Sequence, residues 1–124
     1  MGNTPEKNDE VFDEDMALSG VGGDREYLAE VVGLVRAAWP TLLADMKQGL
    51  VVGDLRTVEA RARLAKAAAR YVAARRAYEC AQQVETLTGK GDLQATQKAI
   101  ASLEREAQLL QSALSMIGNS EGQA

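Results

Sequence analysis

The sequence predicts an all-α protein: an up-and-down four-helix bundle preceded by a short N-terminal helix and a disordered acidic arm. The composition favours helices, because 46% of the residues are hydrophobic and only 4% are aromatic, and the apolar residues are mostly Ala, Leu and Val. Apolar residues recur every three or four positions over most of the chain, which is the spacing of one helix face. No stretch alternates with period two for long enough to predict a strand.

Three Gly-Asp pairs divide the chain, and each is followed at once by a helical pattern. A glycine ends the preceding segment, and the aspartate can accept hydrogen bonds from the free N–H groups at a helix start. The pairs are Gly23-Asp24, Gly53-Asp54 and Gly91-Asp92.

The three units that follow these pairs predict four long helices. Pro40 removes one backbone hydrogen bond from the first unit, so a kink or a brief break is expected there. In the second unit the apolar stripe changes phase near Ala73. A bend there would give two helices, and the alternative is one continuous helix. The last helix should end near Ile117. The predicted organisation is an arm over residues 1–13, a helical domain over 14–117 and a flexible tail over 118–124.

The net charge and the absence of targeting signals restrict the partners and the compartment. The formal net charge is −4, which argues against nucleic acid, because phosphate binding requires a surplus of Lys and Arg. No uninterrupted apolar run approaches the roughly 20 residues of a membrane span, and the acidic N-terminus is unlike a signal peptide. The single cysteine, Cys80, is interpreted as a small core residue in a reducing compartment. We therefore expect a cytoplasmic protein with no membrane partner.

The chain contains no histidine. Histidine is the most common general base and metal ligand, and its unperturbed pKa lies near neutrality. The carboxylates, such as Glu104 and Glu106, have no histidine to work with and fall on solvated faces. No enzymatic activity, cofactor or metal site is expected.

One helix face is a candidate docking surface. Over residues 54–72, charged side chains spaced three and four apart lie opposite a stripe of alanines, with the small Ala67 between the cations. On an acidic protein such a basic strip can dock a partner with clustered carboxylates. An ordinary solvated face, supported by pairs such as Glu59–Arg63, would have the same pattern. The residues of this strip are Arg56, Glu59, Arg63, Lys66, Ala67 and Arg70.

From about Met16 to Leu114, the order of these signals resembles the histidine-containing phosphotransfer (HPt) domain of bacterial phosphorelays. The stretch from Gly22 to Leu28 is similar to the start of that family's second helix, and residues 39–43 followed by the pair at 53–54 keep its order and spacing. The family's active segment has the form His-x-Leu-Lys-Gly, later followed by Gly-Ala. In this chain the corresponding residues are Arg63-Leu64-Ala65-Lys66-Ala67 and Ala73-Ala74.

The position that matches the family's phosphoacceptor is therefore Arg63. A guanidinium stays protonated at physiological pH and has no free lone pair with which to attack an aspartyl phosphate. The resemblance implies an HPt fold with a docking face for the receiver domain of a response regulator or for a histidine kinase, and Arg63 implies that phosphotransfer is absent. We expect a monomer. The alternative is a structural, self-associating bundle or assembly subunit with no phosphorelay partner.

Overall fold

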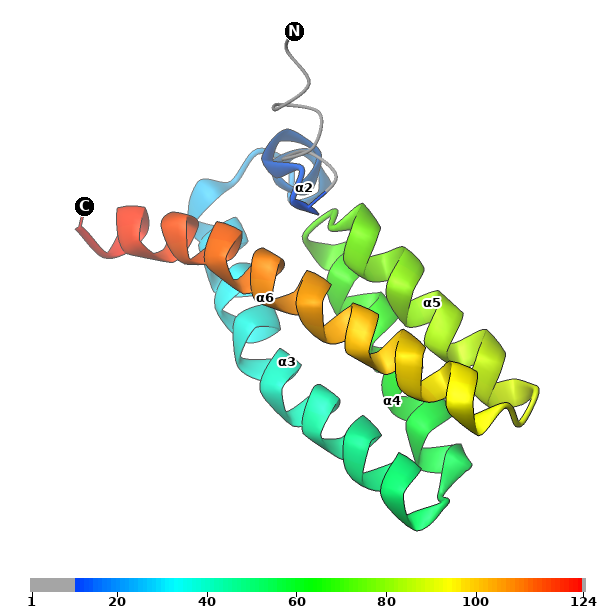
Figure 1. The fold of residues 1–124 in the computed structure, drawn as a ribbon. Helices are drawn as coiled ribbons and strands as arrows, with labels where there is room; N and C mark the ends of the chain where they lie inside the picture. The colour runs from blue at the N-terminus through cyan, green and yellow to red at the C-terminus, as the bar shows by residue number, and fades with distance from the viewer. Residues whose placement is uncertain (1–10, 124) are drawn as a thin grey trace, which may run out of the picture.

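The computed structural model describes residues 11–123, with the side chains of residues 11–117. These residues form helices joined by short turns, and no strand occurs among them, so the predicted fold class is confirmed (Figure 1). The helices are α2 (Glu14–Gly20), α3 (Arg25–Val52), α4 (Leu55–Tyr71), α5 (Arg75–Gly89) and α6 (Leu93–Gln123).

The four long helices form a closed antiparallel bundle. In sequence order each helix packs on the next one, and α6 returns to pack on α3. The short α2 lies at one end of the bundle, near the start of α3 and the turn between α4 and α5 (Figure 1). Short connections between amphipathic helices favour this up-and-down arrangement.

The three predicted Gly-Asp boundaries are confirmed. At each one the aspartate carboxylate accepts a hydrogen bond from the backbone N–H three residues further on, at 3.0–3.2 Å. The preceding glycine has a φ between +73° and +81°, a left-handed conformation that glycine adopts without steric cost. These pairs therefore end one segment and start the next helix at the same point.

The predicted bend at Ala73 is also confirmed, since α4 ends at Tyr71 and α5 begins at Arg75. Ala73 has a φ of +54°, which is unfavourable for a residue with a Cβ atom. The chain reverses there while the N–H of Ala74 donates to the carbonyl of Ala69 at 2.8 Å. At Pro40, in contrast, α3 continues without a break, although a kink or a brief break was expected there.

The core combines large side chains from α3 and α6 with small ones from α4 and α5. Trp39 and Met46 of α3 are completely buried, and so are Leu103 and Leu110 of α6. The buried faces of α4 and α5 consist mainly of alanine. Small side chains let these two helices approach closely, and this brings their charged edges within reach of each other.

Both ends of the helical domain differ from the prediction. Residues 1–10 of the predicted arm lie outside the described residues, but the arm was wrongly extended to residue 13. Phe12 is buried in the core, and the carboxylate of Asp13 accepts from the N–H of Met16 at 3.0 Å to cap α2. At the other end α6 continues to Gln123 rather than ending near Ile117. The prediction placed that end where the apolar spacing stops, and the spacing does not mark where backbone hydrogen bonding stops.

By length and composition alone, α3 could also cross a membrane, with a mean hydropathy of 1.2 over its most apolar 18-residue window. The sequence has no uninterrupted apolar run of that length; the average is high because this window holds at most two charged residues. In the bundle the buried side chains of α3 belong to the shared core, and 28% of the window is buried.

Candidate functional site

The predicted docking strip lies on the outer face of α4. The buried alanines Ala62, Ala65 and Ala69 hold the opposite face of this helix in the core. As a result Arg63, at the position matching the family's phosphoacceptor, points outward and its side chain is 61% exposed.

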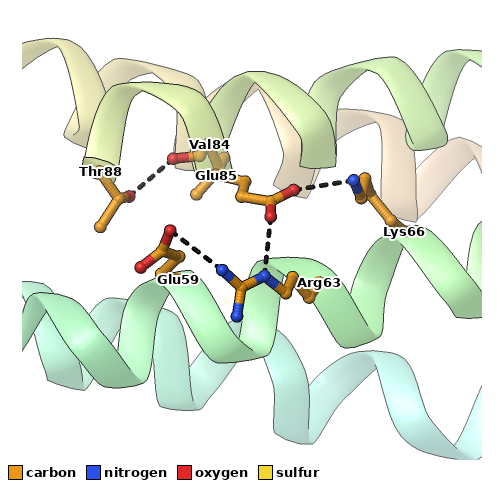
Figure 2. Close-up of polar contacts among 6 residues, drawn as sticks. All are labelled: Glu59, Arg63, Lys66, Val84, Glu85 and Thr88. Atoms are coloured by element: carbon orange, nitrogen blue, oxygen red, sulfur yellow. Dashed lines mark hydrogen bonds and ion pairs between the residues drawn. The ribbon is translucent and has the colours of Figure 1, made fainter. Parts of the chain in front are cut away.

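Arg63 is nevertheless held by two carboxylates (Figure 2). Its Nε donates to Oε2 of Glu85 at 2.8 Å, and its Nη2 donates to Oε2 of Glu59 at 3.3 Å. The second oxygen of Glu85 lies 2.8 Å from Nζ of Lys66. Glu85 belongs to α5, so one carboxylate bridges both cations of α4 and joins the two helices.

This network shifts the titration of two of its members. The hydrogen bond from Lys66, followed by the one from Arg63, lowers the pKa of Glu85 below its ordinary value near 4.5. The hydrogen bond to Glu85, assisted by the charge of Glu59, raises the pKa of Arg63 above its ordinary value. Both groups therefore stay ionised near neutral pH, and the guanidinium of Arg63 keeps all its protons.

The network changes the electrostatic interpretation of the strip. Arg63 and Lys66 are offset by Glu59 and Glu85, so these four side chains together carry no net charge. Among the residues that the structure describes, Arg56 and Arg70 have no carboxylate within ion-pair distance. The uncompensated positive charge of α4 is therefore concentrated at the two ends of the predicted strip.

A tyrosine connects the far end of the strip to α5. Nζ of Lys66 lies 5.8 Å from the ring centroid of Tyr78, and Cζ of Arg70 lies 5.9 Å from it. Both distances are within the range in which a cation is attracted by an aromatic face. Arg70 is thus positioned by an aromatic ring while its charge stays available to solvent.

Beyond Arg70 a cleft of about 850 Å³ opens between α2, the start of α3 and the corner of α4 and α5. All three tyrosines of the chain line it, one each from α3, α4 and α5. Tyr71 is 66% exposed and Tyr27 is 52% exposed. Exposed tyrosine and arginine side chains side by side are typical of surfaces that bind proteins. The cleft continues the predicted docking strip with apolar and aromatic surface.

The structure brings together Glu59, Arg63 and Lys66, while Arg56 and Arg70 lie outside their ion-pair network. Ala67 is exposed and makes no hydrogen bond through its methyl side chain. Glu85 was not predicted from the sequence, although a signal was present: the bend at Ala73 folds α5 back along α4, so residues at similar distances from the bend face each other. The tyrosine cleft was not predicted either.

No cluster of three or more His, Cys, Asp and Glu side chains within residues 11–117 is arranged to hold a metal ion. Glu106 is bound to Arg76 at 2.7 Å and Glu104 to Lys47. These two carboxylates therefore serve as ion-pair partners between helices.

The bundle has the fold of an HPt domain, the class of protein that the sequence resembles. The chain is similar to the crystal structure of the HPt domain from a sensor hybrid histidine kinase of Shewanella, with a TM-score of 0.79. The match covers 90% of this chain and 96% of that one, at 14% sequence identity. No protein-family model and no curated protein matches the sequence. The predicted HPt fold is thus confirmed at the level of structure.

Proposed function

We propose that this chain is a non-catalytic, HPt-like signalling module that binds the receiver domain of a response regulator, or a histidine kinase, and accepts no phosphoryl group. Arg63 carries this proposal. It occupies the outward position of α4 where the HPt resemblance places the phosphoacceptor, and its guanidinium is ionised and engaged by Glu59 and Glu85.

The chemistry of phosphoacceptance requires a neutral nitrogen with a lone pair directed at the phosphorus atom. The guanidinium of Arg63 has no such lone pair, because its nitrogen electrons are delocalised and it stays protonated. The whole chain contains no histidine that could take over this role. We therefore propose that the site binds without transferring a group, and that it does so in the cytoplasm.

Binding through this face remains possible in the presence of the ion-pair network. A guanidinium has five N–H donors, and the contacts to Glu59 and Glu85 use the N–H of Nε and one N–H of Nη2. The HPt resemblance implies a partner whose phosphorylation pocket is lined with acidic residues. Arg63 could donate to those carboxylates while it keeps its contact to Glu85, and Arg70 would add an uncompensated charge.

Apolar surface next to the cations supports a protein partner over a small anion. Leu64 and Tyr71 are both more than half exposed, and Ala67 lies between them on the same face of α4. This surface runs toward the tyrosine cleft. A protein interface needs such an apolar centre beside its charged groups.

The test uses purified receiver domains from the host, phosphorylated in advance with radioactive phosphate. We expect that a receiver that binds this chain transfers no label to it, whereas an active HPt domain in a parallel reaction becomes labelled. A stable phosphoryl group on this chain would contradict the proposal.

The docking face is tested by affinity measurements on the same receivers. Arg63→Glu and Arg70→Glu should each weaken the complex by roughly tenfold or more, since they place a carboxylate against an acidic pocket. Arg105→Glu makes the same charge change on the exposed surface of α6 and should leave the affinity within about twofold. Equal affinities for all three variants would show that α4 is not the docking face.

A further inference from the structure

The outer surface of α3 carries few exposed charges along most of its length. Between residues 33 and 52 this helix carries three charged residues, Arg36, Asp45 and Lys47, and Arg36 is half-buried. Asp45 is paired with Arg61 of α4, and Lys47 is paired with Glu104 of α6. The same surface exposes large apolar side chains, among which Leu34 is 73% and Val51 is 80% exposed. Exposed apolar side chains that lie together on one surface are typical of interaction sites.

The exposed positions of this surface follow a heptad pattern, with spacings that alternate between three and four residues. A repeat of that kind produces a straight seam along one side of a helix. At about 1.5 Å per residue the seam is roughly 25 Å long. Its members, which we call the α3 seam, are Leu34, Ala37, Thr41, Ala44, Gln48 and Val51.

The α3 seam is complementary to itself. If a second α3 runs antiparallel to the first, with a twofold axis beside the peptide bond between residues 42 and 43, Leu34 of one copy lies opposite Val51 of the other. Ala37 then meets Gln48, and Thr41 meets Ala44. The large apolar side chains pair at both ends and small ones meet in the centre, where the two backbones can approach closely. A twofold-symmetric dimer uses the same surface on both subunits, so that surface must be complementary to itself.

The charge distribution favours a second copy of this chain over other occupants. Each copy is acidic overall, so two copies repel each other except where a surface carries no charge. A lipid surface is a poorer fit, since helices that lie on membranes combine an apolar face with flanking Lys and Arg. Here the exposed charges at the start of α3 are Arg25, which is paired with Glu14, and the carboxylates Glu26 and Glu30, so this end has no surplus of cations.

We propose that this protein forms a homodimer in which two α3 helices pack antiparallel through the α3 seam. This inference departs from the sequence-based expectation of a monomer. It is independent of the proposed function, because the docking strip lies on α4 and stays open in such a dimer.

The oligomeric state is the first test. The mass of the full chain, measured by light scattering or sedimentation from about 1 µM to about 1 mM, should rise toward twice 13.3 kDa. Leu34→Glu should increase the dissociation constant at least tenfold, because the dimer buries an unpaired carboxylate at each end. Leu109→Glu, an equal change at an exposed leucine of α6, should not. A constant mass of 13.3 kDa at all concentrations would overturn the proposal.

Cysteine crosslinking tests the antiparallel register. In a Cys80→Ser background, the double variant Leu34→Cys/Val51→Cys should form a disulfide-linked dimer on mild oxidation, because the two thiols of opposite copies face each other. The single variant Leu34→Cys should not, because the seam separates its two copies by roughly 25 Å and a disulfide requires Cα atoms within about 7 Å. Equally efficient crosslinking of the single variant would indicate a parallel pair and overturn the inference.

Discussion

Nε of Arg63 and Oε2 of Glu85 lie 2.8 Å apart and join the middle of α4 to α5. The other oxygen of the same carboxylate lies 2.8 Å from Nζ of Lys66. The cation at the outward position is therefore a structural element of the bundle as well as a candidate docking group. An incoming carboxylate would displace Glu59, whose contact to Arg63 is longer at 3.3 Å, more readily than Glu85.

The bridging carboxylate should contribute measurably to stability. Glu85→Gln keeps the shape of the side chain but removes the charge that holds two cations. We expect the free energy of unfolding near neutral pH to fall by about 0.5–1 kcal/mol, as for a partly exposed ion-pair network. Urea unfolding followed by circular dichroism measures this difference. Glu79→Gln, on the exposed side of the same helix with one partner at Arg75, should cost less than about 0.5 kcal/mol.

The contribution of Glu85 should also depend on pH with a definite sign. Its pKa is lowered in the folded protein, so the stabilisation is complete above the ordinary value near 4.5 and is lost as the pH falls through the lowered pKa. Wild type and Glu85→Gln should therefore converge in stability under acidic conditions. A difference that stays constant down to about pH 2.5 would contradict this assignment.

Substitution of alanine by glycine should have opposite effects on stability at the α4–α5 corner and inside α4. Ala73→Gly should raise the free energy of unfolding by about 0.5–1 kcal/mol, because Ala73 has a φ of +54° and glycine adopts that conformation without strain. Ala67→Gly, at an exposed position inside α4, should lower it by about 1 kcal/mol. Thermal and urea unfolding of both variants provide the measurement. A lower free energy of unfolding in both variants would show that the corner is not strained.

Substitution of glycine by alanine at two positions of α3 should also change stability in opposite directions, because one position is tightly packed and the other is open. A Cβ atom at Gly49 would come within 2.9 Å of Cγ2 of Val58 and within 3.1 Å of the carbonyl oxygen of Asp54. Gly49→Ala should therefore destabilise the protein by about 1–3 kcal/mol. At Gly33 no atom lies within 4 Å of the added carbon, and Gly33→Ala should stabilise by up to about 1 kcal/mol. The measurement is urea unfolding at a protein concentration too low for self-association. An unchanged free energy of unfolding in Gly49→Ala would contradict this prediction.

The single thiol should be slow to react in the folded protein. Burial, followed by the negative charge of Glu106, raises the pKa of Cys80 above its ordinary value, so little thiolate exists at about pH 8. Alkylation by iodoacetamide should be slower than in the unfolded chain. Glu106→Gln removes the carboxylate and releases Arg76 from it, so alkylation should become faster, whereas Glu104→Gln should leave the rate unchanged. Equal rates in both variants would show that Glu106 does not act on the thiol.

The helix boundaries could be predicted because their causes are local. Each Gly-Asp pair contains both the left-handed residue that ends one segment and the carboxylate that caps the next. Phe12 was missed because a single aromatic residue in an acidic stretch leaves no periodic pattern, and its burial depends on surfaces contributed by distant helices. The end of α6 was also placed too early. The residues after Ile117 remain helical although they have no apolar pattern, so no signal in the sequence indicated that the helix continues.

Only the part of the candidate site that lies within α4 was predicted from the sequence. The spacing within α4 correctly indicated an outward Arg63 and its contact to Glu59. The partner from α5, Glu85, depends on how two helices lie against each other, and the cleft depends on three helices that each contribute one tyrosine. Such juxtapositions follow from packing, which periodicity alone does not determine.

The backbone N–H of Asp13 donates to the carbonyl oxygen of Ala73 at 3.2 Å. This one bond ties the segment before α2 to the turn between α4 and α5, two regions that lie far apart along the chain. Hydrogen–deuterium exchange at the Asp13 amide therefore reports the opening of that turn. A spectroscopist could follow whether a bound partner loosens or tightens the far end of α4 by watching a single resonance near the N-terminus.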